Sequence, residues 1–328
     1  MEKLVAQFPR HISEALEIAR SSEFSGLNEY SFANVVICGM GGSGIGGKMV
    51  NQWFSQQSKV PIYLVQDYDI PGFISGKTLF IASSYSGNTE ETMTAVQKAA
   101  KSGAKIVAVC SGGELYKFCQ EHAFHVVKVP GGNPPRTMLA FSVVQLVNIL
   151  SNAQVIPADA LTKIDKCRNL LTKELVSIKE EAKKLAKFAH EKQLILYSTS
   201  NHEAVIIRAR QQFNENSKQL CWHHVVPEMN HNELVGWGGG KASHAVVFFV
   251  SKFISERNKL RLSITRDTVM QHTPHCTLIE GAGENLFEES FYFIHIVDWA
   301  SLFLAELNNA DTIDIKVIDY LKDQLSKL

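Results

Sequence analysis

The sequence predicts an α/β protein in which two units of similar size each hold a parallel β-sheet between layers of helices. Two observations support this class. Short apolar runs alternate with helical patterns, and the alternation occurs in both halves of the chain. Short, continuously apolar runs are typical of parallel strands buried on both faces, and intervening helices supply the crossovers that such strands need. The length of 328 residues also suits about two domains.

The first unit is predicted to span residues 1–152. An amphipathic helix near the N-terminus is indicated by Ile12, Leu16, Ile18 and Ala19. Strands are then expected at 34–38, 61–65, 78–82, 105–110 and 125–129, with helices at 90–101 and 137–152. The last of these helices closes the unit.

The second unit is predicted to span residues 153–328. It begins with a charged, mostly helical connector that we interpret as a solvated helix, whose apolar side comprises Leu171, Val176, Ile178, Leu185 and Phe188. Strands are expected at 193–198, 245–250 and 276–280, with helices at 203–218, 256–271, 285–307 and 315–325. Ligands of such doubly wound folds bind at the carboxyl ends of the strands.

Composition excludes several classes of function. Lys and Arg together number 33, as do Asp and Glu, so neither a nucleic acid nor an anionic membrane surface is an expected partner. The six cysteines form no Cys-x-x-Cys pair, which argues against zinc, and their pattern favours a reducing compartment. With no signal-peptide core and no apolar stretch of about 18 residues, the expected location is the cytoplasm.

A glycine loop follows the first predicted strand. Gly39-Met40-Gly41-Gly42-Ser43-Gly44 fits the dinucleotide pattern G-x-G-x-x-G. The acidic residue that should bind a ribose is represented by Asp67 or Asp69, at somewhat longer spacing than usual. Two other interpretations stay open: a tight strand-to-helix turn, or a loop in which Ser43 approaches a small hydroxylated or anionic ligand.

A hydroxyl-rich loop follows the third predicted strand and opens a helix. Ser84, Ser86 and Thr89 surround Gly87 in the segment Ser84-Tyr-Ser-Gly-Asn-Thr89. A helix N-terminus presents unpaired N–H groups and the positive end of the helix dipole, so these residues can bind a phosphate monoester. Simple capping by Ser86 or Asn88 would use one side chain and would leave the cluster unexplained.

The segment Ser84 to Thr92 resembles the phosphate loop of sugar isomerase (SIS) domains. The glycine loop, extended to Gly47, and three further motifs narrow the resemblance to the bifunctional phosphoglucose/phosphomannose isomerases. The three motifs are Pro134-Pro-Arg136, Phe213-Asn-Glu-Asn-Ser217 and Asn230-His-Asn-Glu-Leu-Val-Gly-Trp237. The match runs from about residue 33 to the C-terminus. It implies two SIS-type subdomains and an aldose–ketose isomerase that interconverts glucose 6-phosphate and fructose 6-phosphate through an enediolate, with mannose 6-phosphate as a further substrate and neither metal nor cofactor.

The resemblance also implies roles for four residues. Glu215 is the isomerising base, although helical spacing would equally allow a surface pair with Lys218. His231 opens the sugar ring from the partner subunit, so the enzyme is expected to be a homodimer. Arg136 stabilises the enediolate, and Lys322 is the candidate for a site lysine on the last helix.

The expected phosphate and sugar contacts are Gly42, Ser43, Ser84, Ser86, Thr89 and Thr312. The sequence departs from the family pattern at the last of these. Asp311-Thr-Ile-Asp314 stands where the family usually has a sequence like Asp-Pro-Thr-Pro, and Thr312 is therefore displaced by one position. The family threonine is linked to acceptance of the mannose epimer, which this displacement puts in question.

Two other functions fit parts of the sequence. A non-catalytic protein that senses sugar phosphates would need the hydroxyl-rich loop but no base. An NAD(P)-dependent dehydrogenase would use the glycine loop.

Overall fold

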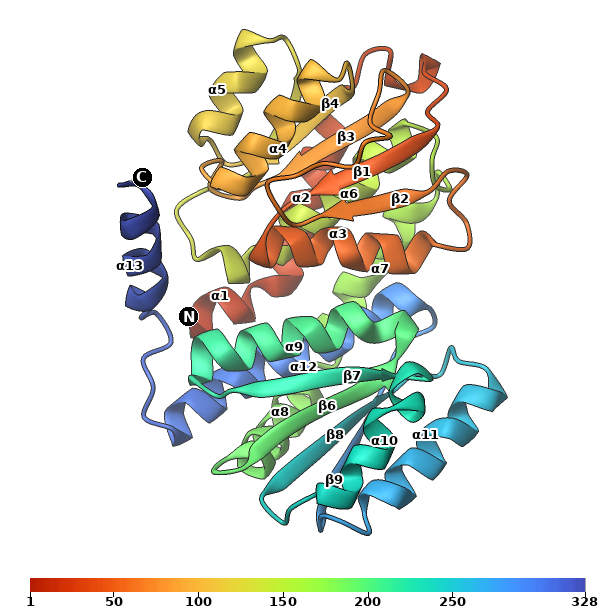
Figure 1. Ribbon diagram of the computed structural model, residues 1–328, viewed down its shortest axis with the longest axis vertical. Helices are drawn as coiled ribbons and strands as arrows, with labels where there is room; N and C mark the ends of the chain where they lie inside the picture. The colour runs from red at the N-terminus through yellow and green to blue at the C-terminus, as the bar shows by residue number, and fades with distance from the viewer. Residues whose placement is uncertain (328) are drawn as a thin grey trace.

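The computed structural model describes residues 1–327, which form two parallel β-sheets, one in each half of the chain (Figure 1). The first sheet has the order β2-β1-β3-β4-β5 and the second the order β7-β6-β8-β9, with every neighbouring pair parallel. The strands of the first sheet are β1 (Asn34–Cys38), β2 (Ile62–Val65), β3 (Thr78–Ser83), β4 (Lys105–Cys110) and β5 (His125–Lys128). Those of the second are β6 (Gln193–Thr199), β7 (Cys221–Val226), β8 (His244–Val250) and β9 (His275–Glu280).

Helices flank both sheets, which confirms the predicted α/β class and its two sheets. The first half contains α1 (Glu2–Ala6), α2 (Phe8–Ser21), α3 (Gly41–Phe54), α4 (Glu90–Lys101), α5 (Gly113–Glu121) and α6 (Leu139–Asn152). The rest of the chain contains α7 (Ala160–Lys173), α8 (Leu175–Ala189), α9 (Glu203–Ser217), α10 (Glu233–Gly236), α11 (Glu256–Val269), α12 (Leu286–Leu307) and α13 (Lys316–Leu325). The domain boundary after residue 152, where α6 ends, stays a prediction.

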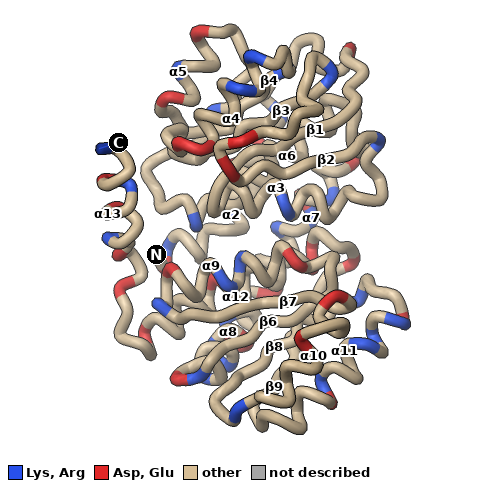
Figure 2. Tube along the Cα trace, in the orientation of Figure 1, with Lys and Arg blue, Asp and Glu red and all other residues tan. Residues whose placement is uncertain are grey.

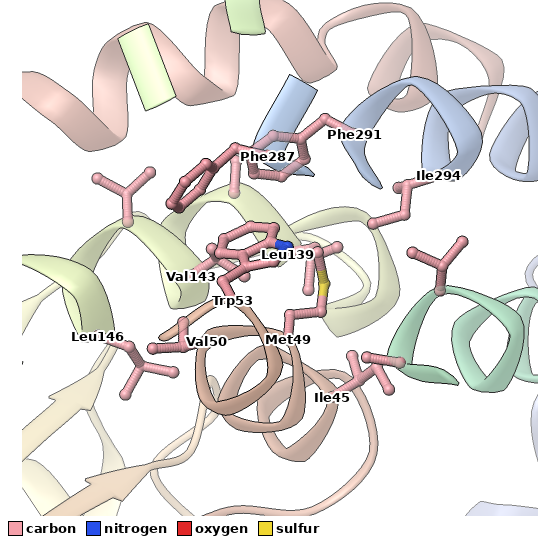
Figure 3. Close-up of a cluster of buried hydrophobic side chains, with 14 of the residues drawn as sticks. Ile45, Met49, Val50, Trp53, Leu139, Val143, Leu146, Phe287, Phe291 and Ile294 are labelled. Carbon is pink, nitrogen blue, oxygen red and sulfur yellow. The ribbon is translucent and has the colours of Figure 1, made fainter. Parts of the chain in front are cut away.

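The main core lies between the two sheets. Alternate residues of β1 face opposite sides: Val35 and Ile37 join this core, whereas Val36 and Cys38 pack with α4 and α5 on the outer face. Figure 3 shows the centre of the core, where side chains of α3, α6 and α12 interlock around Trp53. The indole N–H of Trp53 donates to the Ser290 hydroxyl, so its one polar atom is satisfied. The two halves therefore share one apolar interior.

Helix α12 is long and apolar enough to cross a membrane. In this fold, however, 72% of the relevant segment is buried, and α12 packs against α7, α8 and α9. Continuous apolar sequence here reflects a helix that is surrounded by protein on nearly all sides.

The structure differs from the sequence predictions at the connector, at Val176 and at β7. The connector forms two helices that break at Glu174, and α8 packs along α12, so it is not simply solvated. Val176, assigned to the apolar side, is 71% exposed because Ile178, Ala182 and Leu185 form the buried face. Strand β7 was not predicted because it is an edge strand with exposed positions such as Trp222.

Buried histidines make the stability of this fold sensitive to acid. Burial lowers the pKa of His295 to about 4, and its Nε2 accepts a hydrogen bond from the indole N–H of Trp299. Protonation of Nε2 would remove that acceptor. Because the folded-state pKa lies below the ordinary value of about 6.5, His295 stabilises the fold above pH 6.5, and this contribution is lost as the pH falls from there toward 4.

We predict that replacing His295 with Gln flattens the acid side of the stability profile. In the wild type, His295 alone should lower the free energy of unfolding by up to about 1.4 kcal/mol per pH unit below pH 6.5. Denaturant titrations at pH 7, 6 and 5 measure this slope, with exposed His122→Gln as the matched control. Equal slopes for wild type and His295→Gln would contradict the prediction.

Candidate active site

Two glycines at the start of α3 have no room for a side chain. A Cβ at Gly39 would lie 2.6 Å from the carbonyl oxygen of Ser83, and one at Gly44 would lie 2.4 Å from the carbonyl oxygen of Gly39. A Cβ at Gly42 would approach the carbonyl oxygen of Pro135 to 3.3 Å. The glycines thus let the start of α3 approach both β3 and the Pro135-Arg136 segment, which accounts for the motif without a dinucleotide.

The hydroxyl-rich loop lies between β3 and α4. Ser84 Oγ is 2.8 Å from Thr89 Oγ1 and accepts a hydrogen bond from the Gly87 N–H. Ser86 Oγ accepts from the Asn88 N–H. Thr89 is the N-cap of α4 but makes no side-chain capping bond. The hydroxyls therefore organise the loop and do not cap the helix, so the first N–H groups of α4 stay available to an anion.

Gly87 fixes the shape of this loop. Its φ of +72° lies in the left-handed region, and a Cβ there would lie 1.8 Å from the carbonyl oxygen of Gly112. Asn88 Oδ1 in turn accepts a hydrogen bond from the Glu114 N–H at the start of α5. The loop is consequently held against the neighbouring strand-to-helix turn.

Ser43 joins the two loops. Its Oγ accepts a hydrogen bond of 3.1 Å from the Tyr85 N–H, and its side chain is buried. The hydroxyl of Tyr85 accepts from the Asn133 N–H, just before the Pro134-Pro135 pair. The glycine loop, the hydroxyl-rich loop and the segment that leads to Arg136 thus form one connected set.

Arg136 and Glu215 meet between the two halves of the molecule. Arg136 Nη1 lies 3.2 Å from Glu215 Oε2, with the arginine side chain 5% exposed and the glutamate side chain 33% exposed. Arg136 Nε donates to Asn216 Oδ1, and Nη2 donates to the carbonyl oxygen of Thr312. Burial lowers the pKa of Arg136, which the negative charge of Glu215 opposes. The result is a buried cation beside a partly open carboxylate.

A second ion pair lies behind the first and is fully buried. Arg208 Nη2 donates to both carboxylate oxygens of Asp298, at 3.0 and 2.9 Å, and to the carbonyl oxygen of Arg136. Gln212 also donates to Asp298. This network fastens α9, which carries Glu215, to α12 and to Arg136.

Two of the predicted catalytic residues lie apart from this pair. His231 is exposed in the 3-10 helix η4 (Glu228–His231), which follows the carboxyl end of β7, whereas Glu215 precedes the start of β7. Six residues of strand, roughly 20 Å at about 3.3 Å per residue, separate those ends. Lys322 is exposed on α13, which has no buried residue and stands to the side of both halves (Figure 1).

Residues around the predicted ones complete the site. Asn216 lies inside a motif noted in the sequence, but its contact with Arg136 had no sequence signal. Arg208 and Asp298 are 90 positions apart, and only the folded chain brings them together. Among residues 1–327, no three His, Cys, Asp or Glu side chains gather as metal ligands would. Charges of both signs are interspersed along the described trace (Figure 2).

Comparison with known proteins gives a consistent result. Residues 30–150 match the SIS domain, and residues 178–325 match the bacterial phospho-glucose isomerase C-terminal SIS domain. In its fold, the chain is similar to the C-terminal domain of glucosamine-fructose-6-phosphate aminotransferase from Francisella tularensis, with a TM-score of 0.77 and 15% identity over 95% of this chain and 97% of that one.

Sequence relatives carry the comparison further. The chain is 34% identical, over its whole length and 99% of the relative, to a bifunctional phosphoglucose/phosphomannose isomerase from Caldicellulosiruptor bescii. It is 32% identical to a protein of the same name from Aquifex aeolicus, over 90% of this chain and 91% of that protein. These similarities confirm the resemblance noted in the sequence: the chain belongs to the bifunctional phosphoglucose/phosphomannose isomerase family.

Proposed function

We propose that the protein interconverts glucose 6-phosphate and fructose 6-phosphate through an enediolate, with mannose 6-phosphate as a second aldose substrate. The observation that carries this proposal is the Arg136–Glu215 pair, which places a carboxylate and a buried cation together. The named activities of the relatives support the same substrates. The six cysteines are free thiols, which fits a reducing compartment, and we infer the cytoplasm as its location.

The hydroxyl-rich loop is proposed to hold the phosphate. Ser84, Ser86 and Thr89 offer hydroxyls, and the first turn of α4 offers N–H groups. A phosphate anchored there fixes one end of the substrate. Gly42 and Ser43 line the path from this anchor toward Arg136, since Ser43 contacts the loop and Gly42 lies against Pro135.

Glu215 is proposed to move the proton. Its carboxylate removes the proton from C2 of the open-chain aldose and returns it to C1, while the hydroxyl proton passes from O2 to O1 overall. Negative charge develops on the enediolate oxygens, and Arg136 stabilises it. Arg136 is held in place by Asn216 and the Thr312 carbonyl, so its guanidinium needs little rearrangement during the reaction.

His231 is proposed to open the sugar ring from a second subunit. It lies at the far end of β7 from Glu215, so we assign it to a different site from the Glu215 of its own chain. An exposed imidazole beyond the carboxyl end of a strand can instead reach into the site of a partner subunit, where it transfers a proton to the ring oxygen. Helix α13 exposes Val317, Tyr320 and Leu321, an apolar face that suits a subunit interface and would bring Lys322 with it.

A non-catalytic sugar-phosphate sensor would share the loop but would not need a base beside Arg136. The Arg136–Glu215 contact therefore favours the enzyme, and turnover separates the two functions directly.

We predict that Glu215→Gln loses turnover but still binds substrate. The amide keeps the shape of the side chain and cannot accept the proton, so kcat should fall at least about 100-fold. A coupled assay of fructose 6-phosphate formation from each aldose phosphate measures this, with exposed Glu306→Gln on α12 as the control. Turnover within threefold of wild type would remove Glu215 from its role as base.

We predict that Ser86→Ala combined with Thr89→Ala weakens substrate binding. Loss of two phosphate contacts should raise KM about 10-fold or more at little cost in melting temperature. Ser102→Ala, at the other end of α4, is the matched control. An unchanged KM would contradict phosphate binding by this loop.

We predict that two inactive variants restore activity in each other. In a mixed dimer of Glu215→Gln and His231→Ala subunits, one of the two sites receives both native residues. Random pairing should therefore restore about one quarter of wild-type activity. Co-expression followed by the coupled assay tests this, with particle mass measured in parallel. No recovery in confirmed dimers, or full activity in a monomer, would contradict the shared site.

A further inference from the structure

We propose that the protein has a second ligand site, which binds an uncharged, hydroxyl-rich small molecule such as a free sugar or polyol. The site is a cavity of about 600 Å³ between the end of α3 and the loops that follow β6 and β8 in the second sheet. That volume lies within the range of about 300–1,000 Å³ that is typical of small-molecule sites. Its walls include Asn51, Gln56, Ser200, Phe253 and Asn258.

Sheet topology places the cavity where doubly wound folds bind ligands. The chain leaves the second sheet in opposite directions from β6 and β8, and the crevice at their carboxyl ends is the switch point. Ser200 follows β6 directly, and Phe253 lies in the loop after β8. The candidate active site occupies the same position in the first sheet, between the loops that follow β1 and β3.

Helices α3 and α9 frame both sites, but with opposite ends. The candidate active site combines the start of α3 with Glu215 near the end of α9. The cavity combines Ser200, the first residue of the 3-10 helix η3 (Ser200–His202) that leads into α9, with Asn51 and Gln56 at the end of α3. Gln52 joins these walls, since its amide donates to the Ser200 carbonyl and accepts from the Ala204 N–H. Each half of the molecule therefore presents one site at its switch point, completed by the other half.

The chemistry of the two sites differs. No side chain that lines the cavity is charged. The loop after β8 also uses its hydroxyls internally: Ser251 donates to Glu289, and Ser255 caps α11 by accepting from the Asn258 N–H. The cavity therefore has no counterpart of the Arg136–Glu215 ion pair among its lining residues.

The polar side chains that line the cavity suit a ligand with neutral hydroxyl groups. The side-chain amides of Asn51, Gln56 and Asn258 make no hydrogen bond within residues 1–327, and each offers both donors and an acceptor. Phe253 adds a partly exposed ring. Several amides beside an aromatic face can bind the alternating polar and apolar surfaces of a sugar ring, whereas a purely apolar ligand would leave the amides without partners.

The test compares neutral and phosphorylated sugars on two sets of variants. Calorimetric titrations with D-glucose, D-fructose and D-mannitol measure the cavity, and titrations with fructose 6-phosphate measure the hydroxyl-rich loop. Asn51→Ala with Asn258→Ala removes two amides, and Gln56→Trp blocks the cavity from an exposed position. Ser86→Ala with Thr89→Ala changes the loop alone, and Lys259→Ala is the matched control on α11.

We expect saturable binding of at least one neutral sugar to the full-length wild type. Both cavity variants should weaken it about 10-fold or more, while the loop variant and Lys259→Ala leave it unchanged. Fructose 6-phosphate binding should respond to the loop variant and not to the cavity variants, which separates this proposal from the isomerase. Absence of saturable binding by all three neutral sugars would overturn the proposal. So would neutral-sugar binding that is lost in the loop variant and retained in correctly folded cavity variants.

Discussion

The position of the candidate base depends on the buried Arg208–Asp298 ion pair. Transfer of two charges out of water is costly, and the pair is tolerated because Arg208 contacts both carboxylate oxygens and Gln212 donates a further hydrogen bond. Arg208 also donates to the carbonyl oxygen of Arg136. A single guanidinium thus holds α9 to α12 and fixes the backbone of Arg136.

The antiparallel packing of α3 and α9 explains why the candidate site needs both halves of the chain. The first half supplies the hydroxyl-rich loop and Arg136, and the second supplies Glu215 and Thr312. Because the halves share the core around Trp53, their relative position is set by close packing and not by a flexible hinge. A phosphate anchor in one half can therefore hold a substrate at a defined distance from a base in the other.

The sequence predicts those features whose signal lies in neighbouring residues. Buried strands such as β3 and β4 appear as continuous apolar runs, and the hydroxyl cluster from Ser84 to Thr89 is contiguous, so both could be predicted. The sequence does not predict features that depend on residues distant in the chain but adjacent in the fold. The edge strand β7 lacks an apolar run, and Val176 faces solvent because α8 turns Ile178 toward α12. Nothing in the sequence around Asp298 indicates that Arg208 lies opposite it. The assigned roles of Glu215, His231 and Lys322 came from family resemblance and remain proposals.

The residues proposed for proton transfer and for ring opening are separated in space within one chain. Arg136 and Glu215 meet in a single chain that also carries the hydroxyl-rich loop, and we propose that these parts serve the enediolate step on a bound open-chain sugar. His231 lies at the other end of β7, and α13 leaves its apolar residues exposed. If a second subunit supplies the imidazole, only the dimer can act on the cyclic sugars that predominate in water. Assembly would then control access to the substrate while leaving the geometry of Arg136 and Glu215 unchanged, because that geometry is set inside each chain by Asn216, Arg208 and Asp298.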